Sequence, residues 1–130
     1  MAEMSNFLEN ALINATLRNT TYTSVATVYV SLWTSDPTDA GSGTEVSTSG
    51  TGYARTAVTF GAPSNGVTTN SADVTFPTAT ASWGTVGWIG INDAATSGNL
   101  LYHSPLDTSK TIDSGDIFKI STGNLSVTLA

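Results

Sequence analysis

The stretch SWGTVGWIGIND, residues 82–93, holds two of the chain's three tryptophans and carries no charge before its last residue. Val86 and Trp88 fall on one alternating face of this stretch, and Ile89 and Ile91 fall on the other. Because neither face offers a polar set to water, the pattern predicts a strand that is buried on both sides. The glycines between these residues leave room for neighbouring rings or mark a bulge. We therefore expect residues 82–93 to form the central strand of an all-β domain.

Shorter strands are expected on both sides of this central one. Alternation of apolar and polar residues marks four of them, at 26–34, 53–60, 72–76 and 125–129. Short apolar runs between turn-rich segments mark the others, at 100–103, 110–112 and 117–120. Such spacing predicts a β-sandwich of about eight short antiparallel strands with Greek-key or jelly-roll-like connections.

The connections carry their own signals. Residues 34–44 are rich in Pro, Gly, Asp and Ser, which predicts a long exposed loop. The tripeptide Val-Thr-Phe occurs at 58–60 and again at 74–76, which favours a hairpin that pairs the two copies. The sequence SPLD at 104–107 predicts a turn between two short strands.

Residues 6–18 form the one segment with a helical pattern. Asn6 can cap this helix, and Glu9 can reach back to it as in a capping box. Leu8, Ala11, Leu12 and Ala15 make an apolar stripe at helical spacing. A helix this short is marginal in water, so its stripe has to dock on the chain's own sheet or on a partner subunit. We expect residues 1–20 to be a helical arm and residues 21–130 to be the β-sandwich domain.

Charge and composition exclude several classes of function. Charged residues make up 11% of the chain, against a usual share of about 25%. The net charge is −6, and the four Lys and Arg residues are scattered, which argues against binding to nucleic acid or to anionic membranes. No stretch has the length and hydrophobicity of a membrane span or a secretory signal, so we expect synthesis in the host cytoplasm.

The residues that could carry chemistry do not form a recognised catalytic pattern. His103 is the only histidine, and its neighbour Ser104 must point to the opposite face of a strand, so the pair is not a catalytic dyad. The aspartates in the segments 36–39 and 113–116 are expected to form turns, with a weak ion site as the alternative. We therefore predict that the protein is not an enzyme and has no catalytic, cofactor or metal site. The aromatic residues could instead build a sugar-binding platform, a core or a subunit interface.

Several segments are similar to a family of small virion structural proteins of tailed phages. These segments are LWTSDPTDAG at 32–41, YAR at 53–55, WGTV at 83–86, GNLL at 98–101 and GD at 115–116. The similarity extends over almost the whole chain, from about Phe7 to Leu129. Proteins of this kind include tail fibre proteins and trimeric proteins that decorate and cement capsids.

The resemblance implies a structural role in the virion. Our first expectation is a homotrimeric capsid cement protein on the capsid surface, which binds the major capsid protein and bridges capsomers. The alternative is a tail fibre or tail-tip protein that binds a host glycan through the segment 35–52 and nearby aromatic residues. The predicted contacts between subunits lie on the helix and the last strand, at Phe7, Leu8, Leu12, Leu17, Leu125, Val127 and Leu129.

Overall fold

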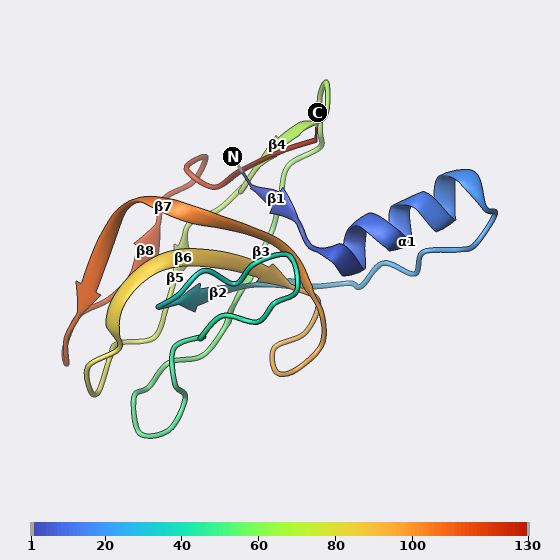
Figure 1. Cartoon of the computed structure of the whole chain (residues 1–130). Coiled ribbons are helices and arrows are strands. Elements are labelled where there is room, and N and C mark those ends of the chain that lie inside the picture. Colours follow the sequence, from blue (N-terminus) through green and yellow to red (C-terminus); the bar gives the residue numbers. More distant parts are fainter. Residues whose placement is uncertain (1, 130) are drawn as a thin grey trace.

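A five-stranded antiparallel sheet dominates the computed structural model, which describes residues 2–129. Strand β6 (Gly84–Asn92) lies at its centre, as the sequence predicts (Figure 1). The order across the sheet is β1-β7-β6-β2-β3. The other four strands are β1 (Glu3–Met4), β7 (Leu100–Ile112), β2 (Val28–Trp33) and β3 (Thr56–Val58).

Both faces of β6 are covered in its C-terminal half. Ile89 and Ile91 are buried, and Gly90 between them has no room for a side chain. A Cβ at Gly90 would lie 2.7 Å from both Leu100 Cδ1 and Ser31 Oγ. The register of β6 against β7 shifts between Val86 and Trp88, where residues 106–109 of β7 lie opposite Gly87 alone, so the extra residues of the bulge belong to β7. Of the two expected uses of glycine, close packing is found at Gly90, while Gly87 lies opposite a bulge in the partner strand.

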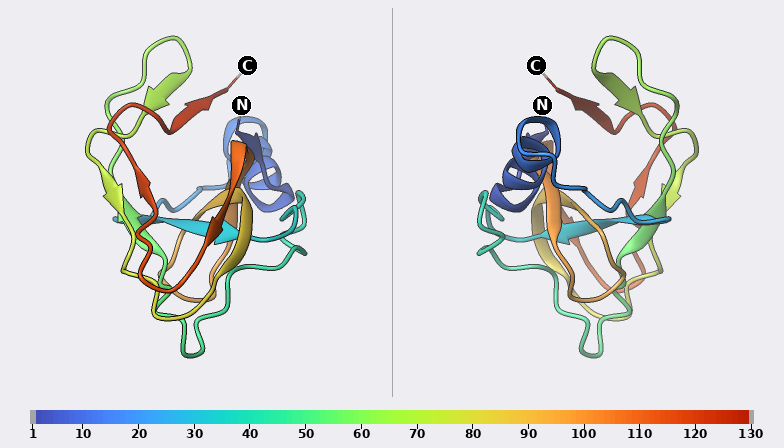
Figure 2. Two further views of the ribbon diagram at one scale, coloured as in Figure 1. Left: turned by 90° about the vertical axis from the view of Figure 1, so that its left-hand side faces the viewer. Right: turned by 90° about the vertical axis from the view of Figure 1, so that its right-hand side faces the viewer.

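Two short ribbons form the second layer and face the large sheet across the core (Figure 2). The first ribbon pairs β4 (Val67–Thr69) with β9 (Ser126–Thr128), and the second pairs β5 (Val74–Thr75) with β8 (Lys119–Ile120). Aromatic rings fill the space between the layers. The ring of Phe76 stacks on Tyr53 at 6.2 Å and meets Phe118 edge-on at 5.6 Å. The all-β prediction with one N-terminal helix is confirmed for the described residues.

Three expectations about the strands are wrong. The two Val-Thr-Phe copies do not form a hairpin, because β3 pairs with β2 while β5 pairs with β8. The chain between them supplies β4, which the sequence did not indicate. The predicted turn at 104–107 is absent, because β7, which is 13 residues long, runs through these positions. Pro105 is tolerated there because the ladder is irregular directly after it, where residues 106–109 of β7 lie opposite Gly87 alone.

Helix α1 (Asn6–Leu17) extends away from the body (Figure 1). Its N-cap is Ser5 and not Asn6, so the expected capping box with Glu9 is wrong by one position. The Ser5 hydroxyl accepts a hydrogen bond from the Leu8 amide and donates one to the Leu100 carbonyl, at 3.2 and 2.5 Å. Leu8 is the only buried residue of α1. Within residues 2–129, no helix is long and apolar enough to cross a membrane.

Candidate functional site

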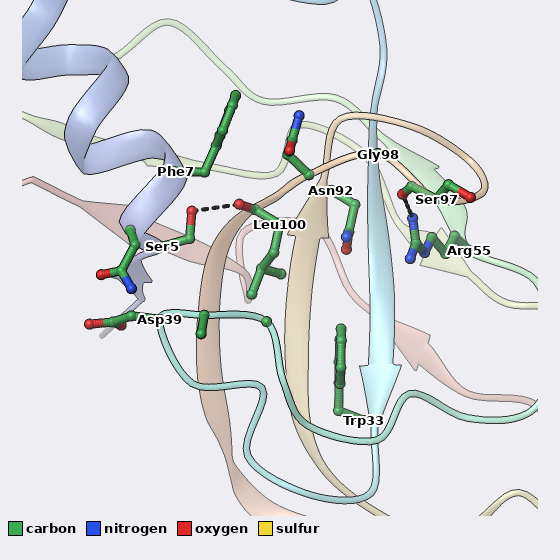
Figure 3. A pocket seen from close by; sticks show the side chains of 13 residues that line it. Ser5, Phe7, Trp33, Asp39, Arg55, Asn92, Ser97, Gly98 and Leu100 are labelled. Carbon is green, nitrogen blue, oxygen red and sulfur yellow. Dashed lines mark hydrogen bonds between the residues drawn. The ribbon is translucent and has the colours of Figure 1, made fainter.

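A pocket of about 300 Å³ lies where the start of α1 meets the β body. The segments 5–7, 39–41 and 97–100 line it, together with Trp33, Arg55 and Asn92 (Figure 3). We call it the Trp33 pocket. It combines an exposed phenyl ring, Phe7, with several amide and hydroxyl groups. A concave site with an aromatic ring and a few polar groups is typical of small-ligand binding.

A buried hydrogen-bond chain fixes the inner wall of the Trp33 pocket. The Trp33 indole N–H donates to Ser31 Oγ at 2.8 Å, and the Ser31 hydroxyl donates to Asn92 Oδ1 at 2.6 Å. Trp33 is only 6% exposed, so it gives the pocket a rigid wall and little free ring face. The aromatic surface that a ligand can reach is therefore mainly that of Phe7, which is 42% exposed.

Arg55 supports the Trp33 pocket and is not free to bind a ligand. Its guanidinium forms two hydrogen bonds to the Glu45 carboxylate, at 2.8 and 2.9 Å. It also donates to the carbonyls of Ala94 and Ser97, at 3.0 and 2.8 Å. The bond to Glu45 raises the pKa of Arg55 despite its partial burial. Arg55 thus holds the segment 93–99 against the body and stays charged.

Glu45 has a second partner in the Tyr53 hydroxyl, which donates to its carboxylate at 2.6 Å. Burial, and then the nearby Glu45 carboxylate, raise the pKa of Tyr53 far above its ordinary value. The same hydroxyl accepts a hydrogen bond from the Leu32 amide at 3.0 Å. This network was not expected, because Glu45 lies in the exposed segment 35–52, for which no buried contacts were predicted.

A second polar cluster lies where β1 pairs with β7 and includes His103; it shares Asp39 with the Trp33 pocket. The imidazole Nε2 lies 2.8 Å from Asp39 Oδ1 and 3.9 Å from Glu3 Oε2. The expectation that His103 serves only as a strand residue missed these contacts. Asp36 does act as a turn residue, since its carboxylate accepts the Thr38 amide at 2.9 Å. Asp39, which was expected to act the same way, instead points its carboxylate at His103.

The predicted interface residues divide by exposure. Phe7, Leu17 and Leu129 are exposed, at 42%, 79% and 42%. Leu12 is half-buried, while Leu8, Leu125 and Val127 are buried within the chain itself. Ile13, which the sequence reading left out, is 53% exposed. Ile13 precedes Leu17 by four residues, which places both on one outward strip of α1. This spacing could have indicated Ile13 as an interface residue.

A weakly charged β body with an apolar helix extending from it is typical of proteins that work by contact with other proteins. A family model described as "Podophage GP4 fiber I protein gp80" matches residues 3–128, so the chain belongs to this family. The protein is therefore a structural component of the virion of a tailed phage. No curated protein matches the chain.

Proposed function

We propose that this protein is a non-enzymatic component of a phage fibre and that it assembles as a homotrimer through α1. The membership of nearly the whole chain in a family named for a fibre protein supports the fibre role. The observation that carries the assembly role is the outward strip of α1, formed by Ile13 and Leu17.

The energetics of α1 favour a partner. A helix of 12 residues is marginal in water on its own, and this one buries a single residue against its own chain. Burying a Leu or Ile side chain contributes roughly 1.5–3 kcal/mol, so packing the outward strips of neighbouring copies together would stabilise both the helix and the assembly. Closed symmetry is the rule for homo-oligomers, and helices arranged around one axis bury each strip equally. We propose three copies because trimers occur among the capsid-decorating proteins that the sequence resembles.

A host glycan is the ligand we propose for the Trp33 pocket. Phe7 offers a ring face on which the apolar face of a sugar can stack, and amides and hydroxyls surround it. Screening the full chain on a glycan array tests this. Phe7→Ala should abolish binding, whereas Ile117→Ala, an exposed apolar residue outside the pocket, should leave it unchanged.

A capsid cement protein that binds the major capsid protein on the capsid surface is the second candidate. The observation that favours it is the shape of the chain, in which α1 reaches out from a weakly charged body and could bridge neighbouring capsomers. Cryo-electron microscopy of intact particles, with antibody labelling of the protein, separates the candidates. Label on the fibres supports our first proposal, and label spread over the shell replaces it with the second.

The role of α1 is tested on the same particles. Ile13→Asp places a charge on the outward strip and should prevent incorporation into the virion. Ile117→Asp is the matched control, because it makes the same change at a residue of similar exposure, 56% against 53%. Normal incorporation of the Ile13→Asp protein would show that α1 is not the assembly element.

A further inference from the structure

Three side chains from distant parts of the sequence meet at the β1 edge of the large sheet. Glu3, Asp39 and His103 each offer one ligand atom, and these atoms all lie within 4.8 Å of one another. His103 is the fixed member, since its side chain is 6% exposed. The carboxylates of Glu3 and Asp39 are 70% and 49% exposed. The cluster therefore pairs one rigid imidazole with two carboxylates that can adjust their positions.

The backbone brings these residues together from both sides. Glu3 and His103 lie directly opposite each other in the antiparallel pairing of β1 with β7. The loop that carries Asp39 is tied to the start of α1, because the Asn6 amide donates to the Asp39 carbonyl at 2.9 Å. Gly43 lets this loop fold on itself, since a Cβ there would lie 2.3 Å from the Asp36 carbonyl oxygen. The position of Asp39 is thus set by the fold.

The donor set matches that of a divalent transition metal. Zinc in proteins is bound by imidazole nitrogen and carboxylate oxygen at roughly 2.0–2.2 Å, and three protein ligands with one open position form a common arrangement. The present separations of 2.8 and 3.9 Å from His103 Nε2 allow both carboxylates to turn toward one ion. On the far side of the ring, Nδ1 lies 4.0 Å from Asp36 Oδ1, which is too long for a hydrogen bond.

The negative charge of the carboxylates around His103 also favours binding of a cation. Three carboxylates, those of Glu3, Asp36 and Asp39, lie within 4.0 Å of the imidazole of a single histidine. The salt bridges of Arg55 and Lys119 go to Glu45 and Asp73 instead. A divalent ion would offset the repulsion among the carboxylates.

We propose that Glu3, Asp39 and His103 bind one divalent transition-metal ion, with Zn²⁺ as the best match to the ligands. Because Glu3 lies in β1 directly before α1, the ion would fasten the helix-bearing segment to the sheet and to the loop of Asp39. Binding to the folded chain alone raises its stability in proportion to the logarithm of the metal concentration. This inference is independent of the proposed fibre role.

The test is titration calorimetry of metal-stripped, full-length protein with ZnCl₂. We expect saturable binding of one ion per chain and a rise in melting temperature with added zinc. Glu3→Gln and Asp39→Asn should each weaken binding by more than roughly tenfold, since loss of a charged ligand costs at least as much as loss of a partner that only orients a ligand. Glu3 is exposed, so its variant should fold normally, which circular dichroism checks. Asp107→Asn, which removes one exposed carboxylate from β7 outside the cluster, should bind like the parent protein.

Two results would overturn the proposal. Absence of saturable binding at millimolar ZnCl₂ would leave His103 as a buried histidine that is paired with Asp39 and needs no metal. Equal loss of binding in Asp107→Asn and Glu3→Gln would mean that zinc associates with surface carboxylates in general.

Discussion

Strand β6 has 9 residues and helix α1 has 12, but the rest of the chain buries much of β6 and leaves most of α1 exposed. In β6, Val86 is completely buried, and Gly90 has no space for even a methyl group. In α1, one residue is buried, and Leu17 at its end is 79% exposed. The β body is therefore complete in packing within one chain, whereas the helix presents apolar surface that the chain itself does not cover. The difference separates residues that hold the fold from residues available to a partner.

The strongest test of this contrast removes a ring from the core. Phe76 is 2% exposed and packs between Tyr53 and Phe118. Phe76→Ala should lower the free energy of unfolding by about 4 kcal/mol, because lost burial and a cavity add together. Urea unfolding followed by tryptophan fluorescence measures this. A loss below about 1 kcal/mol would mean that the second layer is loosely packed.

The next largest effect is expected at the polar support of the Trp33 pocket. Glu45→Gln leaves the Arg55 guanidinium, whose side chain is 11% exposed, without its countercharge. The free energy of unfolding should fall by about 3 kcal/mol, since an uncompensated charge remains in a mostly buried place. Asp113→Asn is a suitable control, because its exposed carboxylate lies in a turn. Equal stability of the two variants would show that the Glu45–Arg55 pair is not desolvated.

A smaller loss of stability is expected at alkaline pH, and it comes from Tyr53 in the β body. Because burial raises the pKa of Tyr53, the unfolded chain loses this proton above its ordinary pKa of about 10 while the folded chain keeps it. The contribution is fully present below pH of about 10, and stability should fall by up to about 1.4 kcal/mol per pH unit above it.

The Tyr53→Phe variant has no ionisable group at this position, so its free energy of unfolding should fall less steeply as the pH rises above about 10. Its baseline stability is lower, since the hydrogen bonds to Glu45 and Leu32 are lost, and the comparison therefore uses slopes. Parallel curves for the two proteins would argue that Tyr53 ionises normally in the folded state.

The smallest effect is expected on α1. Leu17→Ala should change the free energy of unfolding of a single chain by less than about 0.5 kcal/mol, because the side chain has little to lose. Thermal unfolding at low protein concentration measures this. A large loss there would mean that Leu17 packs on its own chain in solution, which would contradict the contrast between α1 and β6.

Patterns within single segments of the sequence correctly predicted individual elements of the fold. The two apolar faces of residues 82–93 identified β6, and helical spacing identified α1. Pro105 was misread as part of a turn, because a proline is tolerated in a strand beside a bulge, and the bulge at residues 106–109 of β7 cannot be read from the sequence. Asp39 and His103 are 64 positions apart, and Glu45 and Arg55 are 10 positions apart outside any regular element, so no spacing rule predicts either contact.

The mass of the assembly in solution tests the central claim most directly. Light scattering coupled to size-exclusion chromatography should give three chain masses for the parent protein and for Ile117→Asp. The double variant Ile13→Asp, Leu17→Asp should give one chain mass with an unchanged β spectrum in circular dichroism. A parent protein that is monomeric at working concentration, or a double variant that remains a trimer, would contradict the assignment of α1 as the surface for self-assembly.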